Sequence, residues 1–171
     1  DRARVRDDLR KEHQGIERKF HEYKGYLAEV HLSQVLLNGQ NSTLPGKFFN
    51  SGRDVAVPRF TYVRHRVRPG SGRGREIDVL GAAGPDQWVC QSKWTVGKKA
   101  GTDVLRHLLS QAEFVREEKN PQTIRMWLFA HDGLTREAED FAREHGILWS
   151  ARPEFDALLR HLGLRTLPDL G

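Results

Sequence analysis

The sequence predicts a single α/β domain with a mixed α+β sheet, in the order helix, three-stranded antiparallel meander, helix, strand, helix, strand. Three observations support this fold class. The chain has 171 residues, which is enough for one hydrophobic core and too few for two full domains. Its first segment has helical spacing and the central segments have the period of strands. The C-terminal half alternates between the two periods.

A charged segment without proline over residues 2–37 is the predicted first helix, as one long helix or two in series. Gly25 is the expected break, because glycine inside a helix is about 1 kcal/mol less favourable than alanine. We therefore expect a charged N-terminal helix over 1–24, acting as a linker or dimerising arm, and a domain over 25–171 that begins with the better buried half. The apolar positions have a heptad-like spacing: Leu9, Ile16, Phe20, Tyr23, Leu27, Val30 and Leu37.

The remaining elements are predicted from the periodicity of apolar residues and from turn-forming and capping residues. Residues 38–58 are rich in turn formers and are expected to be an irregular connection. The meander is predicted from three segments with strand character, the first of them rich in arginine. Thr102 is the expected cap of the next helix, and Gly146 ends the one after it. The predicted strands are 60–68, 76–80, 87–94, 123–130 and 147–150, and the later helices are 102–119, 135–145 and 153–162.

The hairpin formed by the second and third strands brings polar side chains together. If the chain reverses between Gly84 and Pro85, Asp78 lies opposite Gln91 and Glu76 lies opposite Lys93. Residues two apart in a strand point to the same side, so these four side chains are expected to share one face. The other face is expected to belong to the core and carries Ile77, Val79, Trp88 and Cys90.

A carboxylate, an amide and an ammonium group on one sheet surface suit the hydrolysis of a phosphodiester. Oxygen ligands hold Mg²⁺, for which Mn²⁺ often substitutes, and a cation offsets the negative charge that develops during the reaction. The sequence therefore predicts a metal-dependent nuclease site on this hairpin.

Asp78, followed across the hairpin by Gln91-Ser92-Lys93 and preceded by a helix with Gly25-Tyr26-Leu27-Ala28-Glu29, resembles the PD-(D/E)XK (restriction-endonuclease-like) nuclease superfamily. The nearest branch is the Mrr-like restriction endonucleases, in which the last motif has a QxK form. The resemblance spans residues 25–150. It implies a restriction-endonuclease-like core and a Mg²⁺-dependent DNA endonuclease, within a longer restriction or DNA-processing protein.

The resemblance also implies a role for each site residue. Asp78 would be the principal metal ligand, and Gln91 would replace the usual second acidic ligand. The backbone carbonyl of Ser92 would face the ion. Lys93 would orient or activate the attacking water, or stabilise the transition state. Glu29 would contact the ion or its water shell, with Glu76 as a further ligand and Gln111 on the next helix as an accessory residue.

This sequence departs from the family pattern, and each residue also has a purely structural interpretation. Ile77 replaces the usual proline, and Gln91 lacks the charge of glutamate, which lowers the expected metal affinity. Glu76 and Lys93 could form a simple cross-strand ion pair. Gln111 could be an ordinary amide on a helix. A second hypothesis is therefore a nuclease-like module that has lost activity and serves in DNA binding or assembly.

The charge of the chain favours a polyanionic partner. Its 28 Lys and Arg outnumber its 23 Asp and Glu, for a net charge of +5. The basic residues near the proposed site are a predicted DNA-binding surface, although a solvated charged face is the alternative. They are Arg64, Arg66, Arg68, Arg73, Arg75, Lys98 and Lys99.

Other classes are excluded by what the sequence lacks. Cys90 is the only cysteine, so there is no intramolecular disulfide framework and no CxxC metal motif, and the 8 histidines show no zinc spacing. No apolar run is long enough for a membrane span, and there is no secretory leader. We therefore expect a cytoplasmic protein without a membrane partner. The start at Asp1, with Met126 as the only methionine, indicates a fragment of a longer chain.

Overall fold

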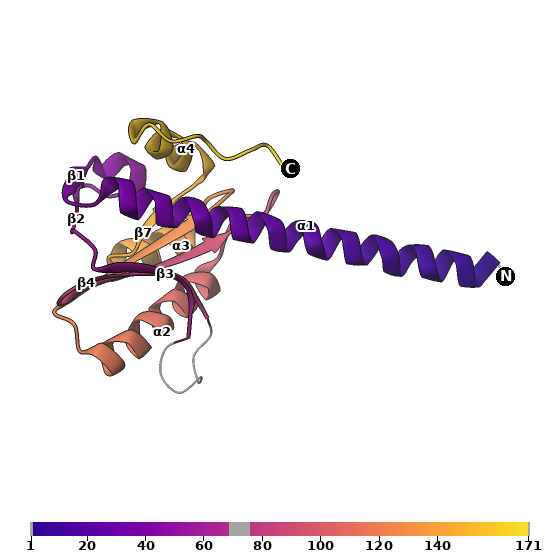
Figure 1. The fold of residues 1–171 in the computed structure, drawn as a ribbon, viewed down its shortest axis with the longest axis horizontal. Helices are drawn as coiled ribbons and strands as arrows, with labels where there is room; N and C mark the ends of the chain where they lie inside the picture. Colours follow the sequence, from indigo (N-terminus) through magenta and orange to yellow (C-terminus); the bar gives the residue numbers. More distant parts are fainter. Residues whose placement is uncertain (1, 69–75, 171) are drawn as a thin grey trace.

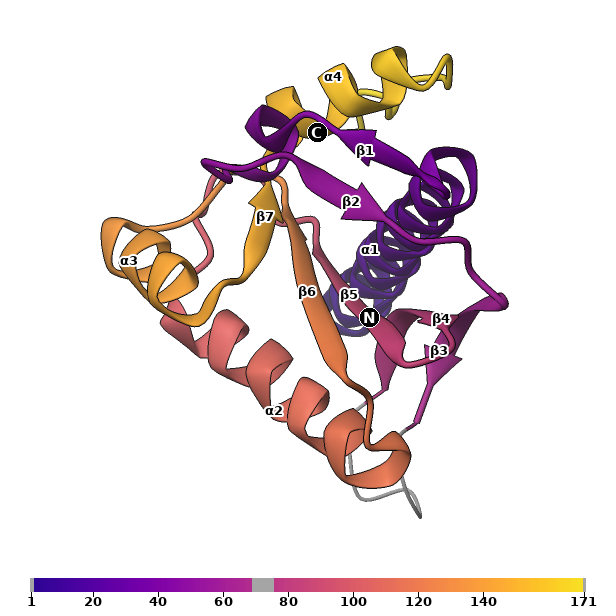
Figure 2. The ribbon, with the colours of Figure 1, turned by 90° about the vertical axis from the view of Figure 1, so that its left-hand side faces the viewer.

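A five-stranded mixed sheet separates two layers of helices in the computed structural model, which describes residues 2–68 and 76–170. Helices α1 and α4 pack on one face of the sheet, and α2 and α3 on the other (Figures 1 and 2). This confirms the predicted mixed α/β class. The elements are α1 (Arg2–Gly39), β1 (Ser42–Leu44), the 3₁₀ helix η1 (Gly46–Phe49), β2 (Val55–Val57), β3 (Tyr62–Val67), β4 (Ile77–Ala83), β5 (Asp86–Lys93), α2 (Thr102–Lys119), β6 (Thr123–Ala130), α3 (Arg136–His145), β7 (Leu148–Ser150) and α4 (Arg152–His161).

The sheet has the strand order β3-β4-β5-β6-β7. Strands β3, β4 and β5 form the predicted antiparallel meander, whereas β5, β6 and β7 run parallel through the crossover helices α2 and α3. The register of the β4–β5 hairpin, with Val79 opposite Cys90 and Ala83 opposite Asp86, is the predicted one. Gly84 supplies the turn with a positive φ of 59°, which glycine adopts without strain.

Each face of the sheet has its own hydrophobic core. On the α1 and α4 side, Leu32 and Phe155 pack with Trp88 and other fully buried side chains. On the α2 and α3 side, Leu105 and Ala138 pack in a second cluster. The sheet is therefore covered on both faces, as parallel strands with crossover helices require.

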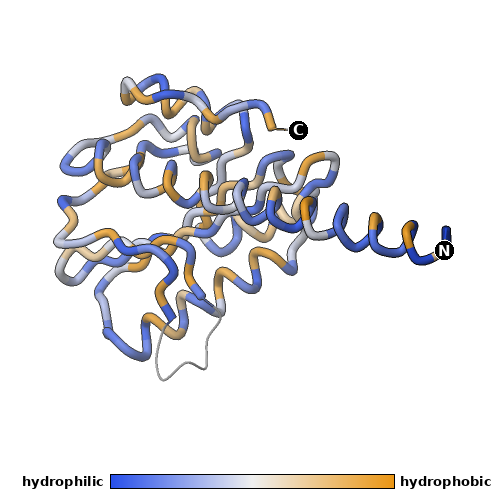
Figure 3. The backbone as a smooth tube through the Cα atoms, turned by 45° about the vertical axis from the view of Figure 1, so that its right-hand side comes forward, coloured by the Kyte–Doolittle hydropathy of each residue, from blue (hydrophilic) through white to orange (hydrophobic). Residues whose placement is uncertain are grey.

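Helix α1 is continuous through Gly25, so the predicted break there is wrong. A 38-residue helix propagates cooperatively past one unfavourable residue, and its C-terminal half is anchored on the sheet. That half is the better buried one, as predicted, with Ala28, Leu32 and Leu36 in the core. The N-terminal half projects away from the domain (Figure 1), and its apolar residues stand isolated among hydrophilic ones (Figure 3).

Residues 38–58 are not the irregular connection that the turn formers predicted. Strands β1 and β2 form a two-stranded antiparallel sheet around η1. Strands of three residues are too short for a period to show in the sequence. The segment is held instead by packing, because Phe48 and Phe49 are buried against α4 and β6. A side chain at Gly46 would lie 2.2 Å from the carbonyl oxygen of Arg53, so the tight path of this segment needs glycine.

The start of α2 differs from prediction. Thr102 is the first residue of α2 and Gly101 precedes it as the cap, without a side-chain hydrogen bond. Thr135 does cap α3, by accepting a hydrogen bond from the Ala138 amide, and Gly146 ends that helix with a positive φ. Within the described parts of the chain, no helix is long and apolar enough to cross a membrane.

Candidate functional site

Asp78 lies where β4 and β5 stop pairing. The last paired residues of the hairpin at this end are Val79 and Cys90, while β5 continues beside β6 as far as Lys93. The Asp78 carboxylate spans the opening between the strands. Its Oδ2 accepts hydrogen bonds from the backbone N–H of Ser92 at 2.8 Å and from the Ser92 hydroxyl at 3.1 Å. Asp78 is thereby joined directly to the Gln91-Ser92-Lys93 segment.

The alternation of side chains is interrupted at Asp78. Strict alternation would place Ile77 and Val79 on one face, as predicted, but Ile77 packs in the α2-side core with Leu80, whereas Val79 packs in the α1-side core. The predicted shared face of Ile77 and Val79 is therefore wrong. Because the order of faces changes next to it, Asp78 is turned toward Ser92.

Gln91 and Lys93 lie on the face that carries α2. Residues paired in register in neighbouring strands point to the same face. Gln91 pairs with Leu128 and Lys93 with Ala130, and both partners belong to the α2-side core. Ser92 pairs with Phe129, which belongs to the opposite core. Gln91 and Lys93 thus share one face, as the sequence predicted, and the side chain of Ser92 points to the other face.

The two motif side chains on the α2 face differ in their surroundings. The Oε1 atom of Gln91 is buried without a hydrogen-bond partner among the residues that are placed. Lys93 is exposed and lines a cavity of about 200 Å³ with Lys98 and Lys99 at the start of α2. Among the described residues, Glu76 lies 3.7 Å from Arg68 and forms no ion pair with Lys93, so the cross-strand pair between them is not formed.

Helix α1 brings Glu29 to the same opening. Its side chain is only 10% exposed, and its Oε2 accepts a hydrogen bond from Nε of Arg66 at 3.1 Å. Glu29 faces inward because it lies one residue after buried Ala28 on the docked half of the helix. Arg66 also lies 4.0 Å from Glu76. Sequence patterns alone gave no sign that Arg66 would contact these acids.

The carboxylates at the site affect the pKa values of Glu29 and Asp78. Burial raises the pKa of Glu29 above its usual range, the hydrogen bond from Arg66 lowers it, and the charge of Asp78 raises it. Burial also raises the pKa of Asp78, which the hydrogen bonds from Ser92 lower and the charge of Glu76 raises. Burial and then the charge of Asp78 raise the pKa of the Cys90 thiol. The site thus concentrates negative charge in a poorly solvated place.

Gln111 is buried on α2 and helps to position this end of the hairpin. Its Nε2 donates a hydrogen bond to the backbone carbonyl of Glu76 at 2.9 Å. The contact ties α2 to the residue that precedes β4. Gln111 therefore lies at the site, through a backbone contact rather than a contact with the acidic groups.

The predicted basic surface is divided by the structure. Arg66 and Arg68 pair with acids of the site. Arg64 is exposed, with its guanidinium 4.2 Å from the centre of the Tyr62 ring. Lys98 and Lys99 lie with Lys93. Arg73 and Arg75, also predicted to bind DNA, lie outside the described residues.

The donor set for a metal is mixed. Within residues 2–68 and 76–170, no group of three or more His, Cys, Asp or Glu is arranged to hold a metal ion. The candidate oxygen donors on these elements are the Asp78 and Glu29 carboxylates and the Oε1 of Gln91, which has no hydrogen-bond partner among the described residues. The carbonyl of Ser92 adds to them, because the N–H and C=O of one strand residue point the same way and this N–H points to Asp78. Such a set of hard oxygens fits Mg²⁺ or Mn²⁺.

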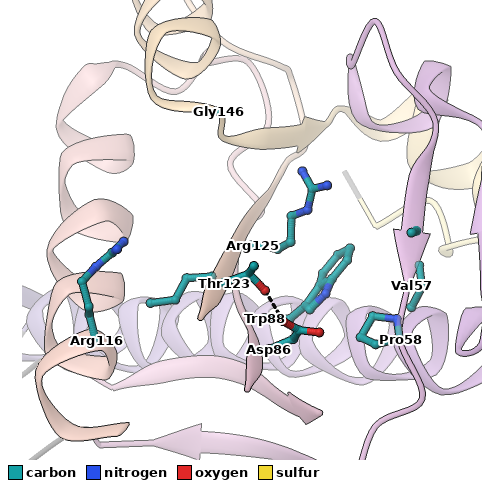
Figure 4. A pocket seen from close by; sticks show the side chains of 10 residues that line it. Val57, Pro58, Asp86, Trp88, Arg116, Thr123, Arg125 and Gly146 are labelled. Atoms are coloured by element: carbon teal, nitrogen blue, oxygen red, sulfur yellow. Dashed lines mark hydrogen bonds between the residues drawn. The ribbon is translucent and has the colours of Figure 1, made fainter. Parts of the chain in front are cut away.

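Two larger cavities lie away from these groups. One of about 590 Å³ is at the opposite end of β5 and β6, where Asp86 bonds Thr123 and Arg125 lies near Trp88, while Arg116 extends from α2 farther away (Figure 4). Another, of about 560 Å³, is lined by the turn that contains His131 and Asp132. Neither contains Asp78, Gln91 or Glu29.

The fold and these strand-end groups define a three-layer α/β protein with an acidic, partly buried site where two antiparallel strands separate. No family model matches the chain, and no curated protein matches it. One solved structure is similar, named "Crystal Structure of Protein of Unknown Function AF1548". It has 18% sequence identity and a TM-score of 0.48, over 60% of this chain and 58% of the other. At this similarity it assigns neither a family nor an activity.

Proposed function

We propose that the chain is a metal-dependent DNA endonuclease domain of the PD-(D/E)XK superfamily, close to its Mrr-like branch, and part of a longer restriction or DNA-processing protein. The observation that carries the proposal is the pair of hydrogen bonds from Ser92 to Asp78. These bonds hold the acid of one strand against the Gln91-Ser92-Lys93 segment of the next, at the point where the strands separate.

The arrangement of elements supports the proposal. A helix that carries an inward carboxylate, Glu29, packs beside a three-stranded meander, which a helix, strand, helix and strand follow. This is the order expected for a restriction-endonuclease-like core. The strand ends that hold Asp78 and Lys93 lie in the same sheet, so one phosphodiester of an extended strand could lie across both.

Each side chain has a role that its position allows. Asp78, Gln91 and the Ser92 carbonyl would hold the ion, with Glu29 or Glu76 completing the oxygen set. When bound, a divalent cation offsets negative charge at the scissile phosphate. Lys93, exposed beside the opening, would orient the attacking water or stabilise the charge that develops on the phosphate oxygens. Arg64, Lys98 and Lys99 would contact neighbouring phosphates.

Cleavage of supercoiled plasmid in Mg²⁺ or Mn²⁺ tests this function. We expect Asp78→Ala and Lys93→Ala each to lower the nicking rate by about 100-fold or more, because each removes a group that acts on the charged phosphate. Arg125→Ala is a matched control, since Arg125 is exposed at the opposite end of β6, and it should cleave at the wild-type rate. Full activity in both site variants would dismiss the assignment.

The second candidate is an inactive module of the same fold that binds DNA or takes part in assembly. Gln91 favours it, because an amide replaces the second acid and no group of three acidic, His or Cys ligands is arranged among the described residues. This module should bind duplex DNA in a salt-sensitive manner without cleaving it. A Mn²⁺ titration separates the two candidates: the nuclease has a saturable ion site that Asp78→Asn removes, whereas the inactive module has none.

A further inference from the structure

Arg66 has an unusual backbone conformation for its residue type. Its φ is 53°, inside strand β3. The other residues besides glycine with positive φ in the described chain are Asn41, Asn50 and Asn120, which tolerate that region far better. Such a conformation is strained and persists only where surrounding contacts impose it. The contacts of the Arg66 side chain are therefore a candidate cause.

Those contacts direct the guanidinium toward the acidic site. Nε of Arg66 lies 3.1 Å from Glu29 and 4.0 Å from Glu76. The hydrogen bond to Glu29 raises the pKa of Arg66, and the charges of Glu29, Glu76 and Asp78 raise it further. Arg66 thus offsets the charge of Glu29 and, together with Arg68, that of Glu76, beside the Asp78 carboxylate to which the proposed function assigns a metal ion.

The two side chains of the Arg66–Glu29 ion pair differ in their exposure to solvent. The Glu29 side chain is 10% exposed and fixed on the docked part of α1, whereas the Arg66 side chain is 54% exposed. The guanidinium has solvent on one side and can reach a phosphate placed outside the strand. Arginine binds phosphate as readily as carboxylate, through charge-assisted hydrogen bonds.

We propose that Arg66 is a built-in counter-cation of Glu29 and Glu76 beside Asp78, which a DNA phosphate draws away so that a divalent ion can bind at Asp78. The inference rests on the proposed nuclease function and adds a coupling between its two ligands. Because DNA removes the competing positive charge, DNA tightens ion binding, and the ion must tighten DNA binding by the same factor. Free protein would then hold the ion weakly, and the complex with DNA would hold it well.

Isothermal titration with Mn²⁺ tests the coupling in the full chain. Without DNA, we expect Arg66→Gln to bind Mn²⁺ about tenfold tighter than wild type, because a repelling charge is gone. Arg66→Lys, which keeps the charge, should bind about as weakly as wild type. Arg125→Gln, which removes an exposed arginine at the far end of β6, is the control for net charge and should not change the affinity. Melting curves establish that each variant is folded.

A second measurement adds DNA, first with Arg66 intact and then with Arg66→Gln. In the Lys93→Ala background, which should hold DNA uncut, a short duplex should tighten Mn²⁺ binding about tenfold. Adding Arg66→Gln to this background should remove most of that gain. Saturable Mn²⁺ binding that responds neither to DNA nor to Arg66→Gln would overturn the inference and leave the nuclease site standing. Absence of any saturable binding that depends on Asp78 would overturn both.

Discussion

At the scale of single residues, Asp78 combines properties that rarely occur together by chance. It is largely removed from solvent, and it lies near the charges of Glu29 and Glu76. The hydrogen bonds that lower its pKa come from the backbone and side chain of Ser92. A carboxylate in such a place lowers stability, and it is retained where function requires its charge. The energetic disadvantage of this charge is itself a testable sign of function.

The first residue-scale prediction concerns stability and pH. The pKa of Asp78 is raised in the folded chain, so the folded state binds the proton more tightly than the unfolded state. The free energy of unfolding should therefore fall as pH rises from the ordinary range of a carboxyl through the raised folded pKa. Asp78→Asn removes this loss and should be more stable than wild type above that window, by about 1 kcal/mol.

Urea unfolding from pH 4 to pH 8 measures the effect. The advantage of Asp78→Asn over wild type should grow with pH until Asp78 is fully ionised, and then stay constant. Asp8→Asn, at an exposed position on the projecting half of α1, should show no such trend. If Asp78→Asn is the less stable protein at pH 8, the carboxylate is a net stabiliser and the argument from burial is wrong.

The register of the hairpin was predictable from the sequence, but the direction of the side chains around Asp78 was not. The register that places Asp78 beside the Gln91-Ser92-Lys93 segment follows from the turn at Gly84 and was correct. The face was not, because the alternation breaks between Ile77 and Val79 and no residue pattern marks such a break. Arg66 was assigned only to DNA contacts, since its pairing with Glu29 joins residues 37 positions apart.

At the scale of elements, helix α1 shows that a single residue with low helix propensity does not determine where a helix ends. Gly25 is intrinsically unfavourable in a helix, yet the helix continues through it to reach the sheet. The long strands and helices of the C-terminal half were predicted almost to the residue, because each helix has an apolar stripe and the long buried strand of this half is a continuous apolar run bounded by turn residues. The three-residue strands β1 and β2 were missed, since their order comes from the packing of Phe48 and Phe49 and not from their own sequence.

The element-scale prediction is that Gly25→Ala stabilises the domain. A Cβ built at Gly25 meets no atom within 4 Å, and the residue lies inside the helix with a helical backbone. Alanine should therefore raise the free energy of unfolding by about 0.5–1 kcal/mol. Gly15→Ala has equally open surroundings but lies on the projecting half, so it should raise helix content without changing the main unfolding transition.

Circular dichroism at 222 nm during urea unfolding distinguishes the two substitutions. Gly25→Ala should shift the midpoint, and Gly15→Ala should change only the starting signal. A lower midpoint for Gly25→Ala would mean that the helix bends or packs closely at this position, contrary to the structure.

At the scale of the whole molecule, the N-terminal part of α1 stands apart from the three-layer core. Residues 2–23 of α1 extend beyond the domain and are exposed, including apolar Leu9, Ile16 and Phe20. Most helical stability in proteins comes from tertiary packing, which the arm lacks, so this arm should open locally far more often than the sheet does. Removing it should leave both cores intact, because the buried residues of α1 begin at Lys24.

Limited digestion with trypsin should therefore trim the chain to a core that begins near Gly25, since arginine and lysine are frequent along the arm. The trimmed core should keep the melting temperature of the intact chain, because the removed residues contribute no buried surface to it. Light scattering of the two forms then separates the two roles considered for the arm: a dimerising arm makes the intact chain twice the mass of a monomer and the core monomeric, whereas a linker leaves both monomeric. A core that unfolds once the arm is cut would show that the arm carries part of the domain's stability, against the burial pattern of α1.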